Sequence, residues 1–467
     1  MPKPLAVVVD DDPQQLAETV SSIEALGFQV IPYEAVAPAR ELLFERGQLI
    51  DVFVLDRKLP MKKGESESDE LGDVLFREVS TAYPDARILV FSGYTDFDHL
   101  QETTSHSGVI EAGPNRILDR VSVYRKQQTD LFDLAVAELR DSLRYIERIA
   151  VHMETPGDRS LIRVLRRVAL QYGGTSLRAQ VLAGGLTQAA VLRCEIFNES
   201  LMVASVVIKV GVSLPSSGGI QDLLPRHLVA SRVGVVSGLM FGRHASVLQL
   251  AGEETTSLFE CMRTDDSPVV EALRVLRAGL DELVPNDGVQ DVRLLDLLPA
   301  VIQPSRLVAI LAEFDIAAPD LEMWVTTRKC ISHLDLHLSN VLLDDGVPVL
   351  IDSEDSGVAS AVVDPLMMLM SSWIHPDSPL FDGSWPIEVI DAKFFLEEGF
   401  TDDAPHKIFF GELVDWVRDR TASARELWAF VLGYAARQTT FPNVRKSARA
   451  REWLIHLMRI ASEKLAD

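Results

Sequence analysis

The sequence predicts an α/β protein in which a doubly wound parallel sheet at the N-terminus is joined by a helix to a two-lobed α+β region. Two observations predict this fold class. Short apolar runs without alternation, such as residues 5–9, take turns with helical stretches near the N-terminus, as in parallel sheets. Farther along, strand–turn–strand patterns precede the polar segment "ISHLDLHLSN", which begins at Ile331 within an apolar frame. A chain of 467 residues is also too long for a single core, so at least two domains are expected.

The composition excludes several classes of function. Hydrophobic residues make up 47% and charged residues 24%, which is typical of a folded globular protein. The formal net charge of −24 opposes binding to nucleic acid or to an anionic membrane, because both depend on neutralising negative charge. A DNA-binding output is therefore rejected, and no terminal basic helix-turn-helix pattern is present.

The cysteines and apolar runs predict a cytoplasmic protein. Cys194, Cys261 and Cys330 are odd in number and far apart, so neither a disulfide framework nor a metal-ligand spacing is indicated. The N-terminus "MPKPLAVVVDDD" reaches carboxylates after a few apolar residues, unlike a signal peptide. Apolar runs such as "PLMMLMSSWI" are shorter than the about 18 residues that span a bilayer, so no membrane partner is expected.

In the N-terminal part, carboxylates follow two predicted strands. Asp10 and Asp11 follow the strand at residues 5–9, and Asp56 ends the strand "DVFVLD". A helix at residues 13–26, a strand at 28–33 and a helix at 37–46 lie between them. Ligands of doubly wound sheets bind at the carboxyl ends of the strands, where three carboxylates would repel one another without a cation. Mg²⁺ prefers oxygen ligands, so these residues predict a Mg²⁺ site. The competing interpretation is that each aspartate merely caps a helix.

Two more strands complete a recognisable order. Ser92 lies at the end of the predicted strand in "RILVFSGY", and Lys126 at the end of the one in "RVSVYRK". Between them, "TTSHSGVIEAGPNR" is expected to be an inserted loop. Together with "VVVDDDP" and "VLDRKLP", this order resembles the flavodoxin-like receiver domain of bacterial response regulators. The resemblance implies that Asp56 accepts a phosphoryl group from a sensor histidine kinase and that Asp10 and Asp11 help to hold Mg²⁺. It also implies that Ser92 hydrogen-bonds the phosphoryl group and that Lys126 pairs with it.

Residues Thr129 to about Glu154 are predicted to form one long helix, broken at "TPGD". The expected domains are a receiver at 1–143, a helical linker at 144–158 and a kinase-like domain at 159–467. One interpretation is that this helix covers the sheet of its own receiver domain. The other is that it forms a homodimer that transmits the receiver state. Its apolar spacing is not a clean heptad, so both interpretations stay open.

The region after the linker predicts a nucleotide-binding hairpin. "LRAQVLAGGLTQAAVLRCEI" has the pattern of two strands around a glycine turn, and the next strand carries Lys209 in an apolar context. Gly184 and Gly185 would let the backbone approach a phosphate, and Thr187 lies in the same turn. A glycine hairpin followed by a strand lysine is how kinases hold ATP, although a lysine whose amine reaches the surface gives the same pattern.

The segment at Ile331 carries a stronger signal. His333, Asp335 and Asn340 have the spacing H-x-D-x-x-x-x-N of the kinase catalytic loop, and the following hairpin ends at Asp352. Such chemistry needs a carboxylate to orient or deprotonate an acceptor hydroxyl, and oxygen ligands for Mg²⁺. The segment "HLDLHLSNVLLDDGVPVLIDSEDSG" resembles the signature of the aminoglycoside phosphotransferase and choline-kinase-like group. Asp364 resembles the aspartate that begins the next helix in that group.

That resemblance implies that Asp335 is the catalytic base, that Asn340 and Asp352 are metal ligands, and that Lys209 clamps the α/β-phosphates of ATP. The loop at Gly184, Gly185 and Thr187 would cover the nucleotide. Arg437 and Arg445, farther along, are better explained as solvated helix charges than as contacts to an anionic substrate.

The two resemblances imply a response regulator whose receiver, phosphorylated on Asp56, controls an ATP-dependent phosphotransferase. The alternative is a phosphorylation-controlled pseudokinase that binds nucleotide or a partner without turnover. The phosphoryl acceptor, a small molecule or a protein, is left open, because the same fold core serves several acceptors. The net negative charge is compatible with a cationic acceptor and equally with mere solubility.

Overall fold

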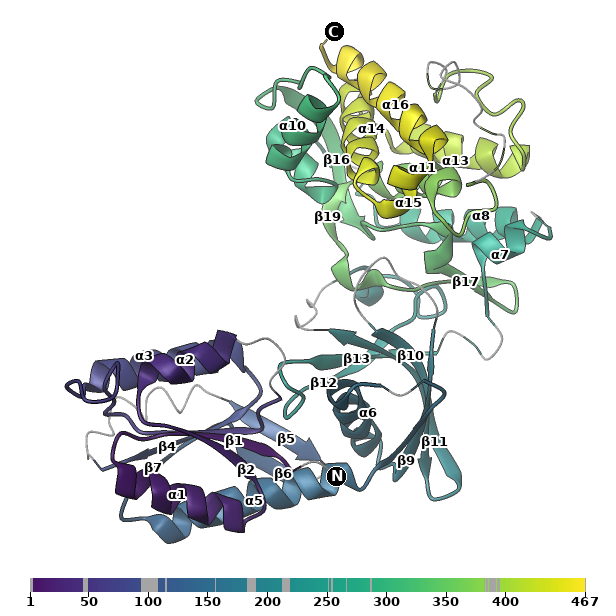
Figure 1. The fold of residues 1–467 in the computed structure, drawn as a ribbon. Coiled ribbons are helices and arrows are strands. Elements are labelled where there is room, and N and C mark those ends of the chain that lie inside the picture. The colour runs from purple at the N-terminus through teal and green to yellow at the C-terminus, as the bar shows by residue number, and fades with distance from the viewer. Residues whose placement is uncertain are drawn as a thin grey trace. The chain divides into compact units, whose positions relative to one another are not determined.

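A computed structural model describes residues 3–44, 49–93, 108–113, 116–155, 157–182, 190–211, 219–250, 252, 255–265, 267–285, 288–381, 383, 385, 392 and 395–466. The chain divides into two compact units, shown in Figure 1. The first unit contains Met1–Leu214 and Arg232–Leu250, and the second contains Pro215–Ser231 and Ala251–Asp467.

The first unit begins with a five-stranded, fully parallel sheet. Its strands lie in the order β2-β1-β3-β4-β7, which is the flavodoxin-like order. Their bounds are β1 (Leu5–Val9), β2 (Gln29–Tyr33), β3 (Val52–Leu55), β4 (Arg87–Ser92) and β7 (Val121–Arg125). β1, β3 and β4 are buried along their whole length, which explains their unbroken apolar sequence. The predicted α/β fold class is confirmed.

Helices cover both faces of this sheet. α1 (Pro13–Ala25) and α5 (Thr129–Glu147) lie on one face, and α2 (Val36–Phe44) and α3 (Asp69–Ala82) lie on the other (Figure 1). Asp12 caps α1 by accepting hydrogen bonds from the backbone N–H groups of Gln14 and Gln15. The helix therefore begins directly after the carboxylates that follow β1.

The long helix predicted to reach Glu154 is shorter, and this expectation was wrong. α5 ends at Glu147, and Ala150–Met153 forms strand β8. β8 pairs in parallel with β9 (Ser176–Val181), starting at Ala150 opposite Ser176. The backbone hydrogen bonds offered by that neighbour outweigh the helical pattern of the local sequence.

Part of the expected inserted loop is a β-hairpin. β5 (Val109–Gly113) and β6 (Arg116–Asp119) pair in antiparallel fashion between β4 and β7 along the chain. Ile110 and Ala112 of β5 are buried, whereas Val109 and Glu111 are exposed. This two-residue alternation turns one face of the hairpin toward a core.

A second, six-stranded sheet completes the first unit. Its order is β12-β13-β11-β10-β9-β8, and helix α6 (Arg159–Gln171) packs on it. The remaining bounds are β10 (Ala190–Asn198), β11 (Leu201–Gly211), β12 (Arg232–Val236) and β13 (His244–Gln249). One apolar cluster runs from β1, β3 and β4 through α5 and the β5–β6 hairpin to α6 and this sheet. The two sheets of the first unit therefore share a core.

Polar contacts fix the two sheets to each other. The carboxylate of Asp51, just before β3, accepts a hydrogen bond from Arg163 Nη1 of α6 at 3.0 Å, and both side chains are almost fully buried. Asp85, just before β4, accepts backbone hydrogen bonds from Met240 and Gly242 at 2.5 Å each. Arg167 donates to the carbonyl oxygens of Glu111 in the hairpin and of Gly238. The Asp51 and Asp85 contacts lie at the amino ends of the parallel strands, opposite the edge that carries Asp56.

The second unit combines helices with two small three-stranded sheets, β14-β17-β18 and β15-β16-β19. The strands are β14 (Thr256–Ser257), β15 (Val289–Arg293), β16 (Trp324–Ser332), β17 (Val341–Asp344), β18 (Val347–Leu350) and β19 (Gly357–Ser360). The helices are α7 (Leu258–Met262), α8 (Ser267–Asp281), α9 (Leu294–Leu297), α10 (Pro304–Glu313), α11 (Val363–Ile374), α13 (Lys407–Arg420), α14 (Ala424–Thr439), α15 (Pro442–Lys446) and α16 (Ala448–Ala466). Short 3₁₀ helices are η1 (Ile220–Asp222), η2 (Leu298–Ala300), η3 (Leu338–Asn340) and η4 (Ser353–Asp355). One continuous core, which contains α11 and most of the inward faces of α13, α14 and α16, holds the unit together.

Across the described ranges, no single helix has the length and apolar character needed to cross a bilayer. The bent pair Leu294–Ala300 and Pro304–Glu313, with 89° between its helices, meets that criterion only when the two are taken together.

Candidate functional site

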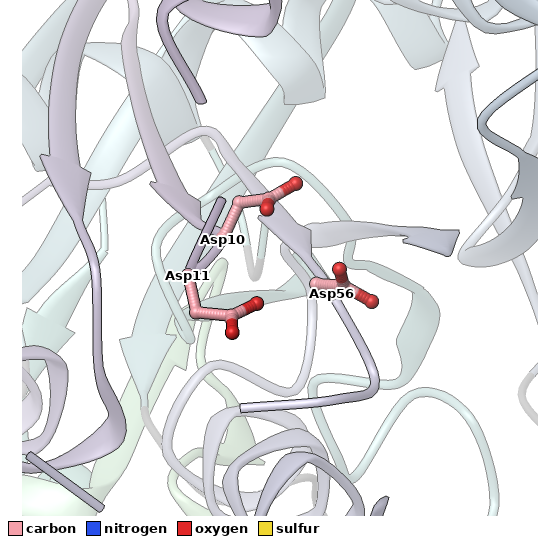
Figure 2. A group of neighbouring side chains, drawn as sticks. All are labelled: Asp10, Asp11 and Asp56. Carbon is pink, nitrogen blue, oxygen red and sulfur yellow. The ribbon is translucent and has the colours of Figure 1, made fainter. Parts of the chain in front are cut away.

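The first candidate site lies at the carboxyl ends of the parallel strands. Asp10 and Asp11 directly follow β1, and Asp56 directly follows β3, its neighbour in the sheet. Each residue offers a carboxylate oxygen, and these three oxygens lie within 4.8 Å of one another. Figure 2 shows the three side chains as neighbours. Three oxygen donors in this arrangement fit a hard divalent cation such as Mg²⁺.

Lys126, the residue after β7, bridges two of these carboxylates. Its Nζ lies 2.6 Å from Asp56 Oδ2 and 2.8 Å from Asp10 Oδ2. Asp56 Oδ1 accepts hydrogen bonds from the backbone N–H groups of Arg57 and Lys58, at 2.6 and 3.3 Å. The ammonium group and these amides hold the Asp56 carboxylate in one orientation.

Burial sets the electrostatics of this cluster. Asp10 is only 3% exposed, and this desolvation raises its pKa from 3.8 to about 6, although Lys126 acts in the opposite direction. Burial also raises the pKa of Asp11, with a further contribution from Glu67. For Lys126, burial disfavours the charge, but its hydrogen bonds to Asp10 and Asp56 outweigh burial, so its pKa is raised. The lysine therefore stays charged near neutral pH.

Ser92 ends β4, the strand beside β3. It is 3% exposed, and its hydroxyl has no hydrogen-bond partner among the described residues. Its backbone oxygen accepts a hydrogen bond from the backbone N–H of Lys126 at 3.1 Å. A buried hydroxyl without a partner costs free energy unless a ligand satisfies it, and an added phosphoryl oxygen is such an acceptor.

The segment after Asp56 is held tightly against α3. Arg57 pairs with Asp73 of α3 at 3.2 Å. Gly72 approaches so closely that a Cβ at this position would overlap the carbonyl oxygen of Arg57. Gly72 therefore permits the close packing that positions the backbone next to Asp56. No local sequence signal marks Gly72, since the close approach depends on the docking of α3.

The second candidate site is the loop after β16. His333 is fully buried, and its Nε2 lies 2.9 Å from the carbonyl oxygen of Ile351, to which it donates because a carbonyl only accepts. Asp364, in the first turn of α11, accepts the backbone N–H groups of His333 and Leu334 at 2.8 and 3.0 Å. Leu334 has a φ of 68°, an unfavourable value for a residue with a side chain. The buried carboxylate thus holds the loop in a strained form, and burial raises the pKa of Asp364.

This loop leaves Asp335 accessible. The Asp335 side chain is 49% exposed, and its two oxygens face different neighbours. Oδ1 lies 3.6 Å from Arg437 Nη2 of α14, and Oδ2 lies 3.8 Å from His337 Nε2. Burial, with smaller contributions from His375 and other nearby groups, holds the pKa of His337 well below its usual range. His337 is therefore neutral, and Arg437 supplies the positive charge.

Asn340 and Asp352 come together at one end of the β17–β18 hairpin. The backbone N–H of Ile351, next to Asp352, donates to the carbonyl oxygen of Asn340 at 3.0 Å. Asn340 Nδ2 donates to the carbonyl oxygen of Asp335 at 2.9 Å, which leaves its Oδ1 as the side-chain atom able to bind a cation. Asp352 has left-handed φ and ψ of 60° and 36°. These two residues would hold a catalytic metal ion.

Of the predicted nucleotide-binding residues, the structure describes Lys209, in the second sheet of the first unit. Lys209 is half-buried on β11, between Val191 of β10 and Ser246 of β13. Gly184, Gly185 and Thr187 fall between β9 and β10, outside the described residues. Strands β9 and β10, which precede and follow these residues in the sequence, form the predicted antiparallel pair.

Comparisons with known proteins find similarity to two kinds of protein. Residues 259–387 match the family model of the phosphotransferase enzyme family. No curated protein sequence matches the chain significantly. Among solved structures, a response-regulator receiver domain from Clostridium thermocellum is 17% identical, with a TM-score of 0.23, and covers 30% of this chain and 97% of its own. A response regulator from Thermotoga maritima is 21% identical, with a TM-score of 0.22, and covers 30% and 98%. Amicoumacin kinase hAmiN, solved with AMP-PNP, Ca²⁺ and amicoumacin, is 16% identical, with a TM-score of 0.34, and covers 61% and 88%.

The chain thus joins an N-terminal domain of receiver topology to a kinase-like part. The receiver topology is inferred from the parallel strand order, and the kinase-like character from the phosphotransferase family match.

Proposed function

We propose that Asp56 accepts a phosphoryl group from a sensor histidine kinase. The observation that carries this proposal is the convergence of Asp10, Asp11 and Asp56 at one sheet edge, with Lys126 joined to Asp10 and Asp56. An Asp56 oxygen forms a bond to phosphorus as the phosphorus–nitrogen bond of phosphohistidine breaks. Bound Mg²⁺ would offset the charge of the phosphoryl oxygens. Lys126 and the Ser92 hydroxyl then contact the new oxygens.

Labelling by acetyl phosphate tests this step. The purified protein with Mg²⁺ should gain one phosphoryl group, measured by intact mass. Asp56→Asn should gain none, and chelation of the metal should stop the labelling. The matched control is Glu70→Gln, which removes an exposed carboxylate from the first turn of the adjacent α3 but not from the cluster. Equal labelling of Asp56→Asn would reject Asp56 as the acceptor.

We further propose that the kinase-like part transfers the γ-phosphoryl group of ATP to an acceptor hydroxyl. Asp335 takes the proton of that hydroxyl as the oxygen–phosphorus bond forms and ADP leaves. Asn340 and Asp352 hold Mg²⁺, and Lys209 binds the α- and β-phosphates. The family match and the accessible Asp335 beside the ordered pair of Asn340 and Asp352 support this role.

ADP release in the presence of ATP and Mg²⁺ tests this second role, because Asp335→Asn keeps the size of the side chain but removes the base. Turnover in the wild type that is lost in this variant supports a phosphotransferase. If neither protein releases ADP and calorimetry finds no ATP binding, the kinase-like part is a binding module without turnover.

In the resulting account, phosphorylation of Asp56 changes the rate of transfer at Asp335. A receiver can exert this control only if its two states differ in free energy of contact with the rest of the protein or with a second copy of the chain. The shared core and the buried ion pair of the first unit join the parallel sheet to the second sheet, which carries Lys209, so a difference between the receiver states would act through them.

A further inference from the structure

Arg437 lies next to Asp335 although the sequence places them far apart. Its guanidinium Nη2 is 3.6 Å from Asp335 Oδ1, and 29% of its side chain is exposed. Arg437 belongs to the last turn of α14, one turn after Tyr434. Tyr434 is almost fully buried, and burial, reinforced by the charge of Asp335, raises its pKa above the usual value. The last turn of α14 thus places one cation beside the predicted base.

The position of Arg437 is fixed by the far end of α14. Glu426, in the first turn, is completely buried and accepts hydrogen bonds from the hydroxyls of Thr327 and Ser360, the latter at 2.6 Å. These hydroxyls belong to β16 and β19, and β16 leads directly into the loop that carries Asp335. Asp335 and Arg437 are therefore both positioned by the packing of α14 against β16 and β19.

Asp335 does not use up the donors of Arg437. A separation of 3.6 Å exceeds the about 2.7–3.2 Å of a nitrogen–oxygen hydrogen bond, so the pair attracts without a hydrogen bond. A guanidinium has five N–H donors and stays charged. Arg437 lies within ion-pair distance of the Asp335 carboxylate, and its guanidinium supplies a permanent positive charge there. The nearby Asp377 interacts instead with His375 and with Ser339.

We infer that Arg437 selects acceptors that carry an anionic group, a carboxylate or a phosphate, close to the hydroxyl that receives the phosphoryl group. This inference rests on the proposed phosphotransferase function of Asp335. A base contacts its hydroxyl at about 3 Å, and an arginine contacts an oxyanion at about 3 Å. Because the two protein groups are only 3.6 Å apart, the hydroxyl and the anion must be a few bonds apart in the acceptor, as in a short hydroxy acid or a hydroxyalkyl phosphate.

Local charge is more informative here than the net charge of −24. Exposed charges farther apart than about 8 Å are largely screened at physiological salt, whereas Arg437 acts at contact distance. A cationic acceptor, which the net charge would favour, would place its charge beside that of Arg437. The site therefore favours an anionic acceptor over an amine-bearing one.

A panel of matched acceptors tests the selectivity. ADP release is measured with glycerate, glycerol 3-phosphate and gluconate, and with the neutral or cationic counterparts glycerol, glucose and glucosamine. In the wild type we expect the anionic members to be preferred. Arg437→Met should lower kcat/KM for them roughly ten- to hundredfold, mainly through KM, and Arg437→Lys should restore part of the loss. Comparing glycerate with glycerol 3-phosphate decides between carboxylate and phosphate.

Two outcomes of this panel overturn the inference. Preference of the wild type for neutral or cationic members contradicts it directly. An equal loss of kcat for all members in Arg437→Met would instead assign Arg437 to the transferring phosphoryl group.

A binding measurement decides the case without turnover. Asp335→Asn removes the negative charge beside Arg437, which repels an incoming anion, so this variant should bind inorganic phosphate more tightly than the wild type, by calorimetry. Asp335→Asn combined with Arg437→Met should lose this gain by roughly tenfold or more. Equal phosphate affinity in the single and double variants would refute an anion site at Arg437. If the panel shows no turnover but this gain and loss appear, the catalytic proposal fails while the anion site stands.

Discussion

Replacing Arg163 tests whether the two sheets of the first unit form one body. Asp51 and Arg163 have side-chain exposures of 1% and 3%, and Arg163 also packs over the ring of Phe241 at 4.9 Å. Removing one member of a buried pair leaves an uncompensated charge and costs about 3–5 kcal/mol. Asp51 would keep the backbone N–H of Leu5 at 2.9 Å and the partly exposed Arg159 at 3.5 Å. We therefore expect Arg163→Met to destabilise the first unit by about 3 kcal/mol.

The tryptophans allow this effect to be located. All six lie in the second unit, from Trp324 to Trp453, so their fluorescence reports that unit, while hydrogen exchange of peptides from β1, β3 and α6 reports the first. Arg163→Met should weaken protection in the first unit by about 3 kcal/mol and leave the tryptophan transition in urea nearly unchanged. Arg159→Met should cost less than about 1 kcal/mol, because that pair is partly exposed.

A double variant provides the refutation. Asp51→Asn with Arg163→Met removes both charges, so it should recover most of the lost stability. If Arg163→Met costs less than about 1 kcal/mol, or if the double variant is no more stable than the single one, the buried pair does not join the two sheets in the way argued above.

Three further predictions concern the two candidate sites. Because the folded pKa of Asp10, about 6, exceeds its unfolded value of 3.8, its contribution to stability is present below pH 3.8 and is lost as the pH rises through 6. In metal-free protein, Asp10→Asn should therefore gain up to about 3 kcal/mol relative to the wild type between pH 4 and 7 in denaturation experiments, and a pH-independent difference would contradict this. Gly72→Ala should cost about 1–3 kcal/mol and slow labelling by acetyl phosphate, because the new methyl group overlaps the backbone of Arg57. Gly411→Ala, in a helix with open space around the glycine, should be neutral or stabilising in the same measurements. Asp364→Asn should lower the tryptophan-monitored stability by about 1–3 kcal/mol, because its amide nitrogen would face a backbone N–H of the loop, and an unchanged transition would exclude this clamp.

The receiver-like site could be predicted because its residues follow strands whose sequence is unambiguous. Buried parallel strands have unbroken apolar runs, and their carboxyl ends meet at one edge, so Asp10, Asp11 and Asp56 had to converge. In the same way, the spacing of His333, Asp335 and Asn340 was sufficient to predict a loop of the kinase catalytic type.

Other features depend on partners that lie far away in the sequence. Strand β8 exists because β9 accepts it as a neighbour, and its own residues continue a helical pattern. Arg437 has the sequence context of a solvated helical arginine, and only the packing of α14 against β16 brings it to Asp335. The roles of Asp51 and Asp85 likewise arise from docking between two sheets, for which no local sequence signal exists.

The most direct test of the account is the rate of ADP release by the full chain, with and without acetyl phosphate, in the wild type and in Asp56→Asn. The account predicts that acetyl phosphate changes the rate of the wild type and leaves that of Asp56→Asn unchanged, while Asp335→Asn has no turnover in either condition. An identical response of wild type and Asp56→Asn, or turnover that survives in Asp335→Asn, would contradict it.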